Sequence, residues 1–274
     1  MGTSTSNSGP GSNVSLDPTW LDDIPKETQS PLERIAKEDL KDIPLPIPTN
    51  IIAPPRRFTA TRKDFASYLR TGNSESFKKA LGHYSREGMG GVKNVVKKLS
   101  ASTAVGAGLY SLLSGIKTSS SQNVHDWINS VKERDLKGQD LIDEIIRVVV
   151  NDGGSLDEES YKDSINQSLS ELLDKVDDIF NLTENEIWSF IASFISNEAY
   201  NRIVSDIGQK IERPSGFLVD NVTRMEEMRD YLHSDIYAQI DECRKNNMVT
   251  NKSDVKKILD LAIEHTFIVY EGEL

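Results

Sequence analysis

Residues 99–116 read LSASTAVGAGLYSLLSGI, an eighteen-residue run without a charged side chain. The run reaches the minimum length of a membrane-spanning helix, but its many Ser, Thr and Gly residues make it far less apolar than a typical span. We therefore interpret it as a central core helix, because small residues let neighbouring helices approach closely. Its expected apolar contacts are Val105, Leu109, Leu112 and Leu113.

The chain on both sides of this run has the same helical pattern. From Thr61 to the end only Pro214 interrupts, and apolar residues recur at helical spacing instead of alternating. Thr183 with Glu186 three residues later forms a capping box ahead of the apolar run 187–195. The pattern predicts an all-α fold, with a multi-helix globular body of seven to nine helices.

Polar residues and glycines mark the expected ends of these helices. We expect Thr61, Ser74, Ser155 and Ser253 to begin helices, because short hydroxyl side chains accept hydrogen bonds from the first free N–H groups. The second helix should end at Gly88, and the glycines up to Gly91 should form a turn between helices, since they lack the sequence of a phosphate-binding loop.

The first part of the chain has a different composition. Nine of the ten prolines lie in residues 1–55, together with Ser, Thr and Gly runs that cannot bury enough apolar surface to offset chain entropy. We expect residues 1–58 to be a disordered N-terminal arm. Two islands, LDPTWL at residues 16–21 and PLPIP at 44–48, resemble docking peptides, although Trp20 could instead pack back on its own domain.

The charges divide the rest of the chain into two regions. Residues 56–98 carry a net charge of +8, whereas residues 99–274 carry −15. We expect a basic helical segment at 59–117, containing the Gly-rich turn and the core helix, and an acidic helical region at 118–274. The basic segment could contact nucleic acid or an acidic partner, or act as an internal electrostatic latch. No nucleic-acid-reading motif is visible, so nucleic acid is not favoured. The basic residues concerned are Arg56, Arg57, Arg62, Lys63, Lys78, Lys79, Arg86, Lys93, Lys97 and Lys98.

Few residues suggest chemistry. The four histidines, His83, His125, His233 and His265, fall on separate predicted helices, which gives no metal-ligand spacing. Cys243 is the single cysteine, so a disulfide framework is excluded and a reducing cytoplasm is the expected compartment. We predict a protein that is not an enzyme, needs no metal or cofactor, does not enter a membrane and has no catalytic residue.

The start of the chain reads Met1-Gly2-Thr3-Ser4. Initiator Met is removed when the next residue is small, so the mature chain should begin with a free Gly2 amine on a flexible tail. Glycine lacks a side chain and can enter a narrow active site with little steric cost. We expect partner binding by the arm residues Gly2, Thr3, Ser4, Leu16, Pro18, Trp20 and Leu21.

Several motifs, taken in order, resemble the QatB family of bacterial Qat anti-phage defence systems. They are Met1-Gly2-Thr3-Ser4, Gly9-Pro10-Gly11, Leu16-Asp17-Pro18-Thr19-Trp20, Ala80-Leu81-Gly82-His83-Tyr84-Ser85-Arg86, and the stretch from Ala104 to Tyr110 with its two glycines. The resemblance covers the arm and about the first third of the body. The acidic remainder is similar only in character.

The resemblance implies a non-enzymatic subunit that works with an ATPase, a QueC-like enzyme and a TatD-like nuclease. Enzymes similar to QueC activate a deazapurine carboxylate with ATP and pass it to an amine, and related defence systems use a protein's N-terminal glycine as that amine. The resemblance therefore implies that Gly2 is a modification site.

Overall fold

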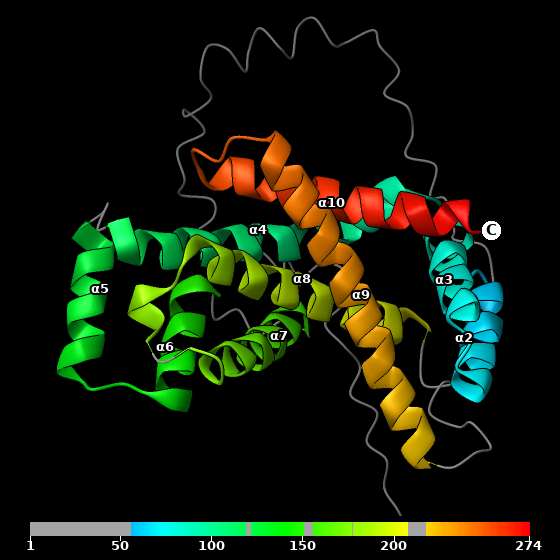
Figure 1. The fold of residues 1–274 in the computed structure, drawn as a ribbon, viewed down its shortest axis with the longest axis horizontal. Helices are drawn as coiled ribbons and strands as arrows, with labels where there is room; N and C mark the ends of the chain where they lie inside the picture. Colours follow the sequence, from blue (N-terminus) through cyan, green and yellow to red (C-terminus); the bar gives the residue numbers. More distant parts are fainter. Residues whose placement is uncertain (1–55, 119–121, 151–155, 177, 208–217) are drawn as a thin grey trace, which may run out of the picture. The chain divides into compact units, whose positions relative to one another are not determined.

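The computed structural model describes residues 56–118, 122–150, 156–176, 178–207 and 218–274, and these belong to one compact unit, Ala53–Leu274 (Figure 1). These residues form nine α-helices, one π-helix and one 3-10 helix, and no strand occurs among them. The predicted all-α fold is confirmed. The predicted arm at 1–58 falls almost entirely outside the described residues.

The first two helices, α2 (Thr59–Thr71) and α3 (Ser74–His83), pack against each other through aromatic side chains. Phe65 and Phe77 meet edge to face with ring centroids 6.1 Å apart. The expected cap at Thr61 was wrong: α2 begins two residues earlier, and Thr61 is buried. Helix α3 begins at Ser74 as expected, and its cap is Asn73, whose side chain accepts from the N–H of Glu75.

The second helix does not end at Gly88 as expected. It continues as a π-helix, η2 (Tyr84–Met89), which closes at Gly90 with φ 78°. The expected turn at the glycines is confirmed at Gly90 and Gly91, and the helix ends at Met89, one residue after the expected helix end. Gly88 is required inside the π-helix, since a Cβ there would lie 2.4 Å from the ring of Phe58.

Helix α4 (Val92–Thr118) contains the uncharged run and packs against both α8 (Glu184–Ile207) and α10 (Lys252–Gly272). A Cβ on Gly106 would lie 3.1 Å from Leu259 of α10 and 3.2 Å from Ile195 of α8, so a small residue permits this approach. Among the described helices α4 alone is long and apolar enough to cross a membrane, and 56% of its most apolar window is buried inside the protein.

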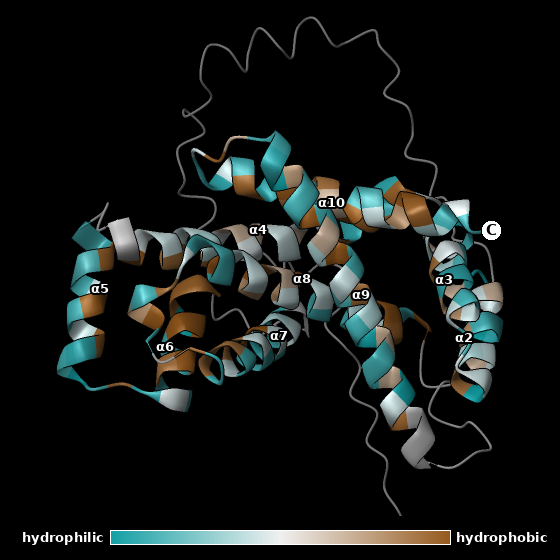
Figure 2. Cartoon of the chain, in the orientation of Figure 1, coloured by the Kyte–Doolittle hydropathy of each residue, from teal (hydrophilic) through white to brown (hydrophobic). Residues whose placement is uncertain are grey.

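The side chains of the run follow the core-helix prediction with one exception. Leu109, Leu112 and Leu113 are buried, whereas Val105 is only partly buried. Figure 2 shows hydrophilic and hydrophobic segments interleaved along α9 (Leu218–Asn246) and α10, as expected for amphipathic helices, whereas the ribbon of α4 is mostly pale.

The acidic region supplies the remaining described helices. They are α5 (Gln122–Glu133), α6 (Gly138–Val149), α7 (Leu156–Leu173), η3 (Ile179–Asn181) and α9 (Leu218–Asn246). α7 and α9 both pack on α8, which is the most deeply buried helix of the described residues. The expected start at Ser155 lies outside the described residues.

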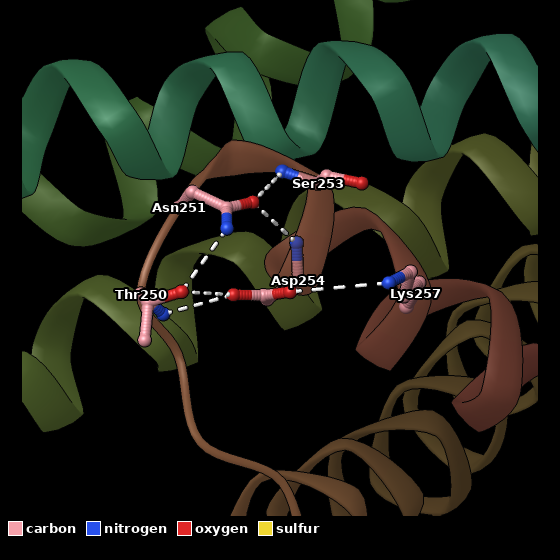
Figure 3. A network of polar contacts seen from close by, with 5 residues as sticks. All are labelled: Thr250, Asn251, Ser253, Asp254 and Lys257. Carbon is pink, nitrogen blue, oxygen red and sulfur yellow. Dashed lines mark hydrogen bonds and ion pairs between the residues drawn. The ribbon is translucent and has the colours of Figure 1, made fainter.

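Two helix starts in this region are well defined. The capping box before α8 is confirmed, because the N–H of Thr183 donates to Glu186 Oε2 at 2.6 Å and the N–H of Glu186 donates to Thr183 Oγ1 at 3.3 Å. The expected cap of α10 at Ser253 was wrong. Asn251 caps this helix by accepting from the N–H groups of Ser253 and Asp254 (Figure 3).

Candidate functional site

The predicted docking and modification residues of the arm lie outside the described residues. They are Gly2, Thr3, Ser4, Leu16, Pro18, Trp20 and Leu21. The described part of the chain therefore contains one set of predicted site residues, the cations of residues 56–98.

Three of these cations bind the acidic part of the same chain. Arg62 Nε donates to the carbonyl of Ile207 at 2.6 Å, and Lys98 Nζ lies 3.3 Å from Asp206 Oδ1. Lys78 forms a more exposed ion pair with Glu273 at 3.7 Å. The internal electrostatic latch, one of the interpretations given for the basic segment, accounts for these three residues.

Tyr84, which the charge count could not single out, completes this latch. Its hydroxyl donates to Asp206 Oδ2 at 2.8 Å, so the carboxylate joins η2, α4 and α8. Burial, followed by the charge of Asp206, raises the pKa of Tyr84 far above its ordinary value, and the phenol stays protonated as a donor. Arg62 binds the carbonyl of Ile207 at the last turn of α8, where the free helix carbonyls carry a partial negative charge.

The other cations remain available to a partner. They are exposed and form no ion pair with any residue in the described ranges: Arg56, Lys63, Lys79, Arg86, Lys93 and Lys97. Arg57 lies over the ring of Phe58, 4.7 Å from its centroid, and is partly buried. Arg70, at the end of α2, is exposed in the same way, although the sequence analysis did not include it.

The histidines are dispersed. His83 lies between two carboxylates, with Nδ1 2.9 Å from Glu87 and Nε2 3.5 Å from Asp64, which ties η2 to α2. His125 and His265 are exposed, and His265 Nδ1 is 3.8 Å from the sulfur of Cys243. In the part of the chain that the structure describes, no group of three or more His, Cys, Asp or Glu side chains could hold a metal ion.

Sequence reasoning missed a buried carboxyl at the centre of the molecule. Glu198 of α8 is fully buried and accepts hydrogen bonds from Ser102 (3.0 Å), Ser160 (3.0 Å) and Ser164 (2.7 Å). Burial raises the pKa of Glu198, and the hydroxyl donors oppose that rise. A carboxyl surrounded by hydroxyl donors from α4 and α7 holds three helices in register, because each donor satisfies an otherwise costly buried oxygen.

The comparisons with known proteins bear on the family. The family model of QatB, described as a Qat anti-phage system associated protein, matches residues 90–270. No curated protein matches the chain, and no solved structure does. Of the motifs that suggested this family, only the stretch from Ala104 to Tyr110 lies inside the match. The acidic region, which was similar only in character, carries most of it.

The matched segment begins at the turn before α4 and continues into the last turns of α10, and so includes the buried Glu198 network and the Asp206 side of the latch. Since the match covers well over half of the chain, this protein belongs to the QatB family of Qat anti-phage system proteins.

Proposed function

We propose that this protein is a non-enzymatic, cytoplasmic subunit of a Qat-type anti-phage complex, in which it serves as a partner or substrate of the other components. The observation that carries the proposal is the family match over residues 90–270. The partners are an ATPase, a QueC-like enzyme and a TatD-like nuclease, as the family resemblance implies.

The proposed reaction uses the Gly2 amine. A QueC-like enzyme joins a carboxylate to the AMP part of ATP and releases pyrophosphate. The Gly2 nitrogen attacks the carbonyl of this acyl adenylate, and an amide forms as AMP leaves and the nitrogen loses a proton. Glycine suits this step because no Cβ hinders the approach of its nitrogen. The arm residues Thr3, Ser4, Leu16, Pro18, Trp20 and Leu21 bind the partner that performs the reaction.

The exposed cations give the body a second point of attachment. Lys63, Lys79, Arg86, Lys93 and Lys97 contact an acidic surface on a partner, whereas Arg62 and Lys98 hold the body together. Exposed charges that lack internal partners favour fast and selective association, and their contribution falls as salt rises.

The test is co-expression with the neighbouring defence components, followed by intact-mass analysis and tandem mass spectrometry of the N-terminal peptide. We expect a mass above that of the Gly2-initiated chain, located on Gly2, together with co-purified partners. The control is Gly2→Glu, in which the large second residue retains Met1 and removes the glycine amine.

The outcomes separate the two parts of the proposal. An unmodified Gly2-initiated mass in a chain that still co-purifies with its partners would remove the modification and leave the subunit role. An unmodified chain that co-purifies with none of these components would remove both.

The exposed cations also favour a second candidate, a nucleic-acid-sensing subunit that uses residues 56–98. Phosphate contacts by Lys and Arg release counterions, so such binding weakens steeply with salt. Failure to bind duplex or single-stranded DNA at low ionic strength would exclude this candidate.

A further inference from the structure

A cavity of about 260 Å³ is lined by residues of α7, α8 and α9 and by Lys175, just after the end of α7. None of its lining residues belongs to the basic stretch 56–98. Most ligand cavities are lined mainly by apolar side chains, with few polar groups. This one has the opposite composition, since Leu172 and Phe190 are its only apolar lining residues.

Helix α8 lines the cavity with a polar stripe. Ser189, Ser193 and Asn197 follow one another at a spacing of four, which places them on one face of a helix. The other faces of α8 carry large apolar residues such as Trp188, Ile191 and Phe194, all fully buried. A polar stripe in so apolar a helix needs polar groups opposite it.

Helix α7 supplies two of those groups and fixes the stripe. Ser193 Oγ donates to Glu171 Oε2 at 3.1 Å, and Asn197 Nδ2 donates to Ser168 Oγ at 2.9 Å. Ser168, Ser193 and Asn197 are buried. These bonds join two helices and hold the polar wall in place before any ligand arrives, which lowers the entropic cost of binding.

Helix α9 lines the cavity with side chains that have no such partners. Arg229 is partly buried and Lys175, just after the end of α7, is exposed. Neither side chain makes an ion pair or hydrogen bond with the described residues. His233, four residues after Arg229, stacks on Tyr237 with ring centroids 6.2 Å apart.

The charges of the lining balance. Burial lowers the pKa of His233, an effect that Glu171 and Asp230 oppose and Lys175 reinforces, so the imidazole is neutral near neutral pH. The remaining charged residues are two cations, Lys175 and Arg229, and two carboxylates, Glu171 and Asp230. A lining with two positive and two negative side chains favours a ligand that carries both a positive and a negative charge.

We propose that this cavity binds a small zwitterion of the amino-acid class. Its carboxylate pairs with Arg229 and Lys175, because a guanidinium presents a fork of N–H donors that matches a carboxylate. Its ammonium group lies toward Glu171 and Asp230, and Ser189 and His233 contribute neutral hydrogen bonds. A volume of about 260 Å³ is enough for a ligand of amino-acid size.

The test uses the full chain and a panel of the standard L-amino acids, with binding measured by saturation-transfer NMR and calorimetry. We expect at least one amino acid to bind. Arg229→Gln should weaken that binding about tenfold, the effect of losing one charge-assisted hydrogen bond. Arg70→Gln, which removes an exposed arginine of α2, should leave the affinity unchanged.

A second variant guards against indirect effects. Ser189 is exposed at the cavity, so Ser189→Trp should fill it and abolish binding without a change in the melting midpoint. The proposal fails if no amino acid of the panel binds at millimolar concentration, or if binding survives both cavity variants. It also fails if inorganic phosphate, added as a separate arm, binds while no amino acid does.

Discussion

The hydroxyl of Tyr84 donates a 2.8 Å hydrogen bond to the carboxylate of Asp206, 122 positions further along the chain. This contact joins the π-helix of the basic segment to the last turn of α8 in the acidic region. Lys98 binds the other oxygen of the same carboxylate. The phenol of Tyr84 and the ammonium of Lys98 therefore both attach the basic segment to the acidic region, in addition to apolar packing.

Removal of the Tyr84 hydroxyl tests this latch. Tyr84→Phe should lower the free energy of unfolding by about 1.5–3 kcal/mol, because a hydrogen bond to a charged group is lost and the Asp206 carboxylate loses a donor. Chemical denaturation measures the change. Tyr231→Phe is the matched control, since the Tyr231 side chain is about half exposed, and its change should stay within about 0.5 kcal/mol. Equal effects of the two substitutions would contradict the role given to Tyr84.

The buried carboxyl of Glu198 predicts a pH dependence. Its folded pKa lies above its unfolded value, so its contribution to stability is present below pH 4.5 and is lost as pH rises through the folded pKa. Glu198→Gln cannot ionise and should escape this loss. As the pH is raised from 4 to 8, the free energy of unfolding of Glu198→Gln should therefore increase relative to that of the natural protein. Urea titrations at each pH measure this difference. A pH-independent difference would contradict the assignment.

Truncation of the same side chain should be more damaging. Glu198→Ala removes the acceptor of three hydroxyl groups and leaves a cavity between α4, α7 and α8. We expect a loss of about 3 kcal/mol or more in the free energy of unfolding, since an unsatisfied donor and a void add together. Ser170→Ala, at an exposed position of α7, provides a comparison that should cost far less.

Gly106 tests the close approach of α4 to its neighbours. Gly106→Leu should destabilise the protein by about 1–3 kcal/mol, because the added atoms meet Leu259 and Ile195 where little space exists. Thermal melting measures the change. Gly272→Ala is the control, since nothing lies within 4 Å of a Cβ there, and its melting midpoint should be nearly unchanged. A tolerated leucine would mean that α4 does not pack as described.

The exposed cations test attachment to a partner separately from stability. We expect the combined variant Lys79→Gln, Arg86→Gln, Lys93→Gln and Lys97→Gln to recover less partner in co-purification at low salt, with an unchanged melting midpoint. Arg62→Gln should show the reverse pattern, since Arg62 bonds to Ile207 within the chain. If both variants bound partners normally, the cations would have no role in attachment.

The arm makes a prediction of its own. Trp20→Ala should reduce recovery of the modifying partner, because tryptophan is the residue type most often found at contact hot spots. The melting midpoint should not change if Trp20 faces a partner, and it should fall if Trp20 packs on its own domain. Thr28→Ala is the control, because Thr28 lies in the arm outside the two expected docking peptides, and it should leave partner recovery unchanged.

Local sequence patterns determined the elements of this protein. Helical periodicity located the α-helices, the small residues of 99–116 identified a core helix, and Thr183 with Glu186 defined a helix start. These features depend on residues within a few positions of one another, which a sequence displays directly. Even here, Asn251 replaced the expected cap Ser253, since several neighbouring polar residues compete for one position and packing decides among them.

Only the tertiary structure decided which polar groups meet. Ser102 and Glu198 lie 96 positions apart, and the lining of the α7, α8 and α9 cavity comes from three helices. Periodicity states which face of a helix is buried, but the partner of a buried side chain depends on how the helices are rotated and shifted against each other. That arrangement is set by the whole core at once, so neither the Glu198 network, the Tyr84 latch nor the cavity could be obtained from spacing along the chain.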